Sequence, residues 1–349
     1  MVWSEDFAIR SLSPDVASER AQVAALLGEH DLQYEPDIEY TVGVFAGDRM
    51  VATGSIAGRV IKCVAVSRSV RGQNLTAKVV SHLKLKAYHR GVHSLFLFTN
   101  PEHRAVFAAL GFSALVQTDD AVLFEDNKLG LRRYLKRLSL VRRSQGSTAA
   151  LVMNCNPFSN GHRYLVETAS QHADQVVLFL VQEDRSVFPF DTRLSLVSDG
   201  VADLANVTVV PGGDYLISAA TFPSYFIKDC GRVDAVHAEL DATLFGKSVA
   251  PAVGATLRLV GQEPYCQVTA HYNRTLAAVL PRFGIELVEI ERKASAGRAI
   301  SASEVRRLWA QDDLDALARI VPETTYRFLL SEAAQPIKRQ LQGAQDEDR

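Results

Sequence analysis

The second half of the chain alternates short apolar runs with helical stretches, and this alternation most limits how the chain can fold. Strands separated by helices predict a parallel sheet with right-handed crossovers and helices on both faces. Ligands of such sheets bind at the carboxyl ends of the strands, near the reversal of strand order. We therefore expect a Rossmann-like, doubly wound α/β domain. Its expected strands are residues 149–154, 175–181, 206–210, 233–237, 256–260 and 285–290.

The first part of the chain mixes strand and helix patterns, which predicts an α+β fold. A turn at Gly47 and Asp48 favours a hairpin, and Gly111 is a typical C-terminal helix cap. Strand, helix and strand in succession predict a βαβ unit. In order, we expect a hairpin at 41–58, a strand near 60–66, a helix over 75–90, a buried strand at 94–99 and a helix over 102–110.

A basic segment separates the two patterns. Residues 128–143 contain seven Lys or Arg and no acid, and a short polar stretch with glycine follows. A solvated helical face over an apolar stripe is the simpler explanation, and a docking strip for an acidic partner is the alternative. The candidate docking residues are Arg132, Arg133, Lys136 and Arg137. The predicted parts are a first domain at 1–127, a connecting segment at 128–147, a second domain at 148–335 and a polar tail at 336–349.

Composition fits two soluble domains. The chain has 349 residues, 47% hydrophobic and 22% charged, which is long enough for two separate cores. A net charge of −2 gives no global basic field that would favour nucleic acid. The four cysteines are widely spaced, the N-terminus has acids where a signal peptide needs a basic start, and no stretch approaches ~18 unbroken apolar residues. We expect a reduced, cytoplasmic protein that binds neither nucleic acid nor membrane.

The segment NPFSNGH at 156–162 lies between the first apolar run and a helical pattern. Gly161 lets the backbone approach a ligand, and the free N–H groups of the helix start favour an anion. Ser159 and His162 add side-chain donors, so the segment outlines a phosphate site. On these residues alone, a capping role for Ser159 or Asn160 with a surface His162 is the simpler explanation. A buried, inert Cys155 likewise explains that residue better than a nucleophile does.

A second helix start follows the last apolar run. Ser301 and Glu304 form the S-x-x-E pattern of a capping box, which a purely structural role explains. Ser303 in the first turn, Arg306 one turn later and the nearby Lys293 add a hydroxyl and cations suited to polyphosphate. Two anion sites on separate helix starts suggest a nucleoside triphosphate.

Together the two helix starts resemble the (T/H)xGH and ISSTxxR motifs of the nucleotidylyltransferase superfamily. The segments NPFSNGHRYLVE, VGQEPY, YNRTL, ISASEVR and VPETTYRFL are similar to the citrate lyase synthetase family, also called citrate (pro-3S)-lyase ligases. That resemblance covers nearly the whole chain and implies an acetyltransferase-like (GNAT) domain first, because VRGQNL at 70–75 and ALGF at 109–112 look like a GNAT segment. Asn74 replaces the second glycine of the GNAT R-G-x-G loop, which leaves both a catalytic and a scaffold role open for the first domain.

The resemblance implies an acid-thiol ligase that uses ATP to acetylate a thiol. The thiol belongs to the CoA-derived prosthetic group on the acyl-carrier subunit of citrate lyase, and the reaction passes through acetyl-AMP to AMP and diphosphate. His162, Ser159 and Asn160 would act at the α-phosphate, with Mg²⁺ bound through ATP. The implied ATP-binding residues are Asn156, Pro157, Phe158, Gly161, Lys293, Ser301, Ser303 and Arg306. Candidates for the acetate or substrate pocket are Glu263, Tyr272 and Asn273.

Two alternatives of other classes stay open. The two helix starts alone would equally fit an adenylyltransferase that acts on a phosphorylated small molecule. The GNAT-like segment would fit an acyltransferase with a regulatory nucleotide domain.

Overall fold

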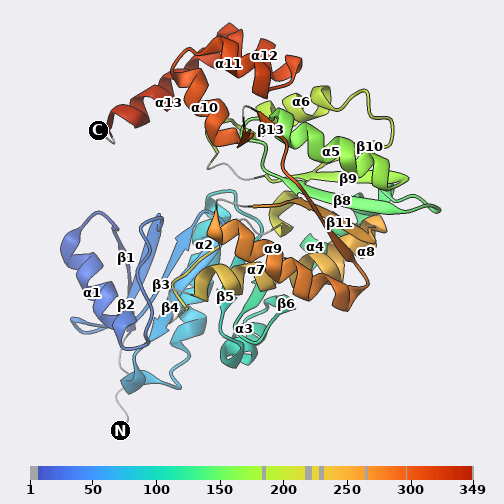
Figure 1. Ribbon diagram of the computed structural model, residues 1–349. Helices are drawn as coiled ribbons and strands as arrows, with labels where there is room; N and C mark the ends of the chain where they lie inside the picture. Colours follow the sequence, from blue (N-terminus) through green and yellow to red (C-terminus); the bar gives the residue numbers. More distant parts are fainter. Residues whose placement is uncertain are drawn as a thin grey trace. The chain divides into compact units, whose positions relative to one another are not determined.

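The chain divides into two compact units (Figure 1). The first contains residues 1–133 and 222–240, and the second contains residues 134–221 and 241–349. The sequence pattern gives no sign that 222–240 packs with the first unit. The computed structural model describes residues 7–182, 186–216, 222–227, 232–263, 266–295 and 297–347.

The first unit is built on a seven-stranded mixed sheet of order β1-β2-β3-β4-β5-β7-β6. β4 and β5 run parallel, and the other neighbouring strands are antiparallel. The predicted hairpin, the βαβ unit and the α+β class are confirmed. The strands are β1 (Phe7–Leu12), β2 (Tyr40–Ala46), β3 (Arg49–Ala57), β4 (Val60–Val66), β5 (Phe96–Thr99), β6 (Ser113–Gln117) and β7 (Val122–Glu125).

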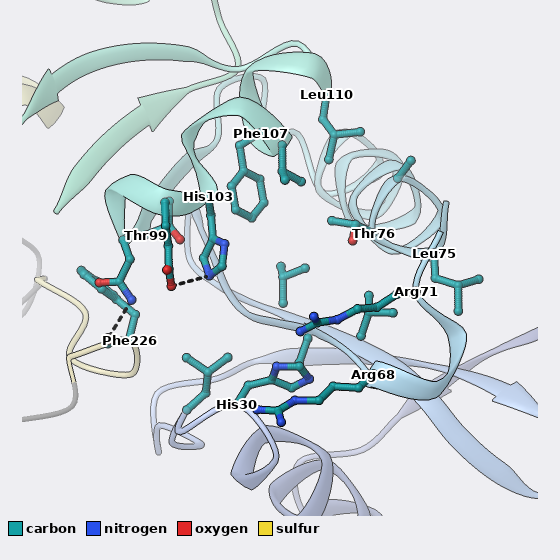
Figure 2. Close-up of a pocket in the computed structure, with 18 of the residues that line it drawn as sticks. His30, Arg68, Arg71, Leu75, Thr76, Thr99, His103, Phe107, Leu110 and Phe226 are labelled. Carbon is teal, nitrogen blue, oxygen red and sulfur yellow. Dashed lines mark hydrogen bonds and ion pairs between the residues drawn. The ribbon is translucent and has the colours of Figure 1, made fainter. Parts of the chain in front are cut away.

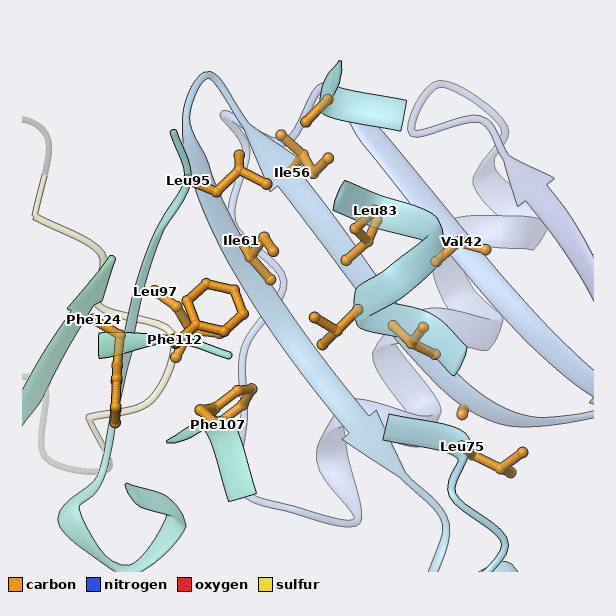
Figure 3. Packing of buried hydrophobic residues seen from close by; sticks show 14 of the residues in the cluster. Val42, Ile56, Ile61, Leu75, Leu83, Leu95, Leu97, Phe107, Phe112 and Phe124 are labelled. Carbon is orange, nitrogen blue, oxygen red and sulfur yellow. The ribbon is translucent and has the colours of Figure 1, made fainter. Parts of the chain in front are cut away.

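Helix α2 (Leu75–His89) supplies much of the core of this unit. Its Leu83 side chain packs with Val42, Ile56 and Ile61 from the strands (Figure 3). The unit also contains α1 (Ala17–Gly28) and α3 (Arg104–Ala109). The predicted end of α3 is confirmed, since Gly111 has a φ of +87°, which favours glycine.

The second unit contains a five-stranded, fully parallel sheet of order β10-β9-β8-β11-β12. The chain begins in the middle with β8, moves outward to β9 and β10, and then crosses to β11 on the other side of β8 (Figure 1). Strand order therefore reverses between β8 and β11, and the predicted doubly wound α/β class is confirmed. The strands are β8 (Thr148–Met153), β9 (Gln175–Leu180), β10 (Val207–Pro211), β11 (Leu257–Gly261) and β12 (Glu286–Ile290).

The helices of the second unit include α5 after β8 and α10 near the C-terminus. Its residues near the C-terminus, expected to be a polar tail, form α13 with Leu341 buried at 9% exposure. No helix in the described parts of the chain is long and apolar enough to cross a membrane. The helices are α5 (Asn160–His172), α6 (Phe190–Gly200), α8 (Ala250–Val253), α9 (Gln267–Val279), α10 (Ala302–Ala310), α11 (Leu314–Ile320), α12 (Glu323–Leu330) and α13 (Gln335–Glu347).

The strand predicted at 233–237 is wrong, because this run lies in helix α7 (Val233–Leu244). Val236, Leu240 and Leu244 are buried, and their spacing of four residues is helical. A short apolar run does not by itself distinguish a buried strand from a buried helical segment. The parallel sheet consequently has five strands where the sequence pattern predicts six.

Candidate active site

The loop after β8 fixes the start of α5 by a reciprocal pair of hydrogen bonds. Ser159 is the N-cap: its Oγ accepts from the His162 backbone N–H at 3.4 Å, and its own N–H donates to His162 Nδ1 at 3.1 Å. The His162 ring stacks on Phe158 with 6.0 Å between ring centroids. Because Nδ1 accepts a main-chain N–H, the proton of the neutral imidazole is assigned to Nε2.

The environment keeps this imidazole uncharged. Burial, helped by the positive charge of Arg292, lowers the pKa of His162 from 6.5 to about 4. At neutral pH the ring therefore offers a neutral Nε2–H donor at the start of α5. Ser159 has the capping role that was considered for it. His162 is not the surface residue that the same explanation assumed, because its side chain is partly buried.

The second helix start lies against the first. A Cβ at Gly161 would lie 3.0 Å from the Ile300 carbonyl oxygen, which is tighter than most Cβ contacts, so this close approach favours glycine. Ile300 directly precedes Ser301, the N-cap of α10, and its N–H donates to the Lys293 carbonyl oxygen at 3.0 Å. The Lys293 ammonium lies 5.8 Å from the ring centroid of Tyr164 on α5. Lys293 and Ile300 therefore lie beside the first turns of α5.

Arg306 joins the two motifs directly. Its Nη1 donates to the Asn156 carbonyl oxygen at 2.5 Å, and its Nη2 donates to Ser303 Oγ at 3.2 Å. Ser303 is exposed, whereas Arg306 is partly buried. Burial lowers the pKa of the Arg306 guanidinium from its ordinary high value. One guanidinium thus spans the loop after β8 and the first turn of α10.

The start of α10 has one half of the predicted capping box. Ser301 Oγ accepts from the Glu304 N–H at 3.1 Å. The Glu304 carboxylate binds the Arg307 guanidinium, at 2.7 and 2.8 Å, instead of returning to the N-cap. Ser301 is therefore a helix cap.

Other predicted residues of the first loop make internal contacts. Asn156 Oδ1 accepts from the Phe188 N–H at 2.9 Å, and Asn160 Nδ2 donates to the Arg319 carbonyl oxygen at 3.1 Å. Pro157 and Phe158 are buried. These contacts hold the loop in shape.

Arg193 on α6 was not identified from the sequence, although it holds the same loop. Its fully buried guanidinium donates to the carbonyl oxygens of Asn154 and Val181, both at 2.8 Å, and of Phe188 at 3.0 Å. Cys155 beside it is 1% exposed, and burial raises the pKa of its thiol. A protonated, buried thiol fits the expected inert role.

Residues that follow β11 and β12 form an ion pair at the carboxyl ends of these strands. Glu263 accepts the Cys266 N–H through Oε1 at 3.1 Å and binds Arg292 Nη2 through Oε2. Arg292 Nε donates to the Gln262 carbonyl oxygen at 2.7 Å. Arg292 was not identified from the sequence, where it is one of two cations in ERK at 291–293.

The other two pocket candidates lie on α9 in separate contacts. Asn273 is 4% exposed, and its Nδ2 donates to the Gly261 carbonyl oxygen at 3.0 Å at the end of β11. Tyr272 Oη donates to Asp241 Oδ2 at 2.5 Å. Burial and the Asp241 carboxylate raise the pKa of Tyr272 well above its ordinary value.

The first unit contains a cavity of about 790 Å³ (Figure 2). β4 and β5 pair at Val60–Phe96 and Ile61–Leu97, whereas β4 continues to Val66 and β5 to Thr99. The cavity lies beyond this pairing and is lined by β4, the start of α2, and α3. Tyr225 closes one side, where its Oη donates to the Phe98 carbonyl oxygen at 2.6 Å.

Cations line one side of this cavity. Figure 2 shows the Arg68 and Arg71 side chains on the side that also carries His30. Among the described residues neither guanidinium pairs with a carboxylate, and the buried Nε2 of His30 has no hydrogen-bond partner. Asn74, which replaces the second glycine of the R-G-x-G loop, has a φ of +58°, so it adopts the left-handed conformation that glycine would supply.

The basic segment forms α4 (Gly130–Leu138), which is strongly amphipathic. Tyr134 and Leu138 are buried, as the predicted apolar stripe requires. The basic face consists of the exposed residues Arg132, Arg133, Lys136 and Arg137, none of which forms an ion pair within the described ranges.

Comparisons with known proteins agree with these motifs. The family model of the citrate lyase ligase C-terminal domain matches residues 148–329. A citrate (pro-3S)-lyase ligase of Escherichia coli (strain K12) is 43% identical over 315 residues, 88% of this chain and 90% of that protein. One of Klebsiella pneumoniae is 40% identical over 316 residues, covering 89% and 92%. Among solved structures, Escherichia coli ElaA aligns with a TM-score of 0.31 at 16% identity, over 34% of this chain and 98% of that one. The chain therefore belongs to the citrate lyase ligase family, whose members are ligases.

Proposed function

We propose that this chain uses ATP and acetate to acetylate the thiol of the CoA-derived prosthetic group on the acyl-carrier subunit of citrate lyase. The observation that carries the proposal is the meeting of two helix starts around a neutral His162. Helix N-termini and a guanidinium suit a polyphosphate. Membership of the citrate lyase ligase family supports the choice of acceptor.

In the first half-reaction an acetate oxygen attacks the α-phosphorus of ATP. The bond from that phosphorus to the bridging oxygen breaks, diphosphate leaves, and acetyl-AMP remains. The His162 Nε2–H and the first N–H groups of α5 stabilise charge that gathers on the α-phosphate oxygens. Ser303 and Arg306 hold the β- and γ-phosphates, which aligns the leaving group.

In the second half-reaction the thiolate sulfur attacks the acetyl carbon. A thioester bond forms, the carbon–oxygen bond to AMP breaks, and AMP leaves with that electron pair. The thiol proton is lost to solvent before attack. The two half-reactions need no covalent nucleophile from the protein, which is consistent with the buried, protonated Cys155.

Magnesium enters this proposal as part of the MgATP substrate. Within the described parts of the chain there is no group of three or more His, Cys, Asp or Glu side chains that could hold a metal ion. Magnesium would supply neutralising charge on the phosphates. The protein groups proposed to contact those phosphates are Ser303, Arg306 and the α5 N–H groups.

Incubation with ATP, acetate and deacetylated citrate lyase tests this function. We expect AMP, diphosphate and restored lyase activity, all dependent on acetate. A dinucleotide product formed without acetate would instead identify an adenylyltransferase. Acetylation from acetyl-CoA without ATP would identify a GNAT-type acyltransferase.

The basic face of α4 is proposed to dock the carrier subunit, because acyl carriers are typically acidic and these four cations have no ion-pair partner among the described residues. We expect reversal of Arg132, Arg133, Lys136 and Arg137 to Glu to slow acetylation of whole citrate lyase at least tenfold at low salt. Acetate-dependent diphosphate release without the protein substrate should stay within twofold. Near 1 M salt, where the Debye length is about 3 Å, the variant and the wild type should converge. Loss of both activities, or of neither, would contradict docking.

The cavity of the first unit favours a second candidate function, acyl-CoA binding. Arg68 and Arg71 form no ion pair among the described residues, and their guanidinium groups suit phosphates. The divergence of β4 and β5 leaves main chain beside the cavity for an extended amide ligand. Equilibrium binding of acetyl-CoA without ATP tests this. Submillimolar binding that weakens about tenfold in Arg71→Gln would support it, and equal affinity in the variant would contradict it.

A further inference from the structure

Three side chains of the candidate site come after neighbouring strands of the parallel sheet. His162 follows β8, Glu263 follows β11 and Arg292 follows β12, and these strands are adjacent in that order. Their carboxyl ends therefore share one edge of the sheet. Because strand order reverses between β8 and β11, His162 and the Glu263–Arg292 pair lie on opposite sides of the reversal point, where such sheets bind ligands.

The segment after Arg292 confirms that this edge is closely packed. Lys293 reaches the ring of Tyr164, two residues beyond His162 on α5. Its carbonyl oxygen accepts from Ile300, whose own carbonyl lies against Gly161. The nucleotide motifs therefore lie on the α5 side of the reversal point, and Glu263 and Arg292 lie on the side of β11 and β12.

Glu263 is poorly suited to bind an acid. Its side chain is 6% exposed, one carboxylate oxygen accepts a backbone N–H and the other binds Arg292. Another carboxylate would be repelled by it. Arg292 is different: its side chain is 28% exposed, Nε and Nη2 are engaged by Gln262 and Glu263, and Nη1 makes no hydrogen bond within the described residues.

We propose that Arg292 binds the carboxylate of the acid substrate and that Glu263 positions its guanidinium. A guanidinium held by two fixed partners has little rotamer freedom left to lose when it accepts a planar carboxylate. One acetate oxygen is held by Arg292, and the other is directed at the α-phosphorus beside His162. The inference deepens the proposed function and rests on it.

Steady-state kinetics of acetate-dependent diphosphate release test the subsite. Arg292→Lys keeps the charge and loses the planar fork, so the KM of acetate should rise about tenfold or more while the KM of ATP stays within twofold. Glu263→Gln releases the guanidinium and should raise the KM of acetate by a smaller factor, with kcat within threefold of the wild type. Arg327→Lys is the matched control, because Arg327 forms an exposed ion pair with Glu323 on α12; both KM values should stay unchanged.

The outcomes separate the subsite from the proposed function. An active wild type whose KM of acetate is unchanged in both Arg292→Lys and Glu263→Gln would overturn the subsite alone. An equal rise in the KM of ATP and acetate would assign Arg292 to the nucleotide and also overturn it. No acetate-dependent diphosphate release by the wild type would refute the proposed function and the subsite with it. If thermal unfolding shows that Arg292→Lys does not fold, the Glu263→Gln result decides.

Discussion

The two helix starts of the candidate site have the same N-cap residue but differ in the third residue of the helix. Each begins with a serine N-cap, Ser159 in α5 and Ser301 in α10. In α5 the third helical residue, His162, turns back onto the cap, and its ring is fixed and partly buried. In α10 the third helical residue, Glu304, turns outward to Arg307. The first start holds one uncharged donor rigidly, whereas the second places the exposed Ser303 hydroxyl beside the partly buried Arg306 guanidinium.

From this difference we expect the two helix starts to have different roles. A fixed, neutral donor is suited to stabilise charge that develops only during reaction, because it pays no reorganisation cost at that moment. A cation that contacts the phosphates of the bound nucleotide binds substrate and transition state alike. Changes at α5 should therefore alter rate, and changes at α10 should alter affinity.

The largest expected effect is on His162. His162→Ala removes the Nε2–H donor, so the rate of acetate-dependent diphosphate release should fall about 100-fold or more while the KM of ATP changes much less. His172→Ala, at the exposed end of the same helix, is the control and should retain the wild-type rate. An unchanged rate in His162→Ala would remove the distinction between the two starts.

The depressed pKa of His162 predicts a pH-dependent stability. In the folded protein the pKa of this ring is about 4, whereas in the unfolded chain it has its ordinary value of 6.5. Between these values the unfolded state binds more protons, so the contribution of His162 to stability is present above pH 6.5 and is lost as pH falls. Chemical denaturation at pH 7 and pH 5 should show a loss of about 2 kcal/mol that is absent in His162→Gln. Equal losses in both proteins would mean that the ring is not held neutral.

Arg306→Lys tests the second start. Lysine keeps the charge, but it cannot bridge the Asn156 carbonyl oxygen and Ser303 Oγ as the guanidinium does. We expect the KM of ATP to rise about tenfold with kcat within threefold. Arg307→Lys on the neighbouring exposed position is the control. A fall in kcat without a change in KM would show that α10 also acts during the chemical step.

The smallest effects should come from the two caps. Ser159→Ala and Ser301→Ala each remove an N-cap hydrogen bond and should lower the free energy of unfolding by about 1 kcal/mol. Only Ser159→Ala should also slow diphosphate release, by a factor of several, because its hydroxyl lies 2.9 Å from the His162 Nδ1. Equal rates in the two variants would argue against a positioning role for Ser159.

The sequence predicted the layers and the two helix starts because both depend on local patterns. Apolar periodicity identified β8, β9, β10, β11 and β12, and serine with glycine or glutamate marked the starts of α5 and α10. Local patterns could not exclude a strand at 233–237, since four-residue spacing becomes visible only when the run is extended to Leu244. Nor could they identify Arg193 and Arg292, whose partners are carbonyl and carboxylate groups brought near by the fold. Glu263 was noticed in the sequence, but its partner was not.

The assignment of residues 222–240 to the first unit has a consequence for the order in which the protein is made. Ser224 donates to Glu35, Tyr225 donates to the Phe98 carbonyl oxygen, and Arg232 pairs with Asp120, so these late residues contact much earlier residues of the first unit. A ribosome that has released only residues 1–133 has not yet released those partners. The first unit can be finished only after β8, β9 and β10 of the second have emerged, and a gene cut after codon 133 would encode neither unit whole.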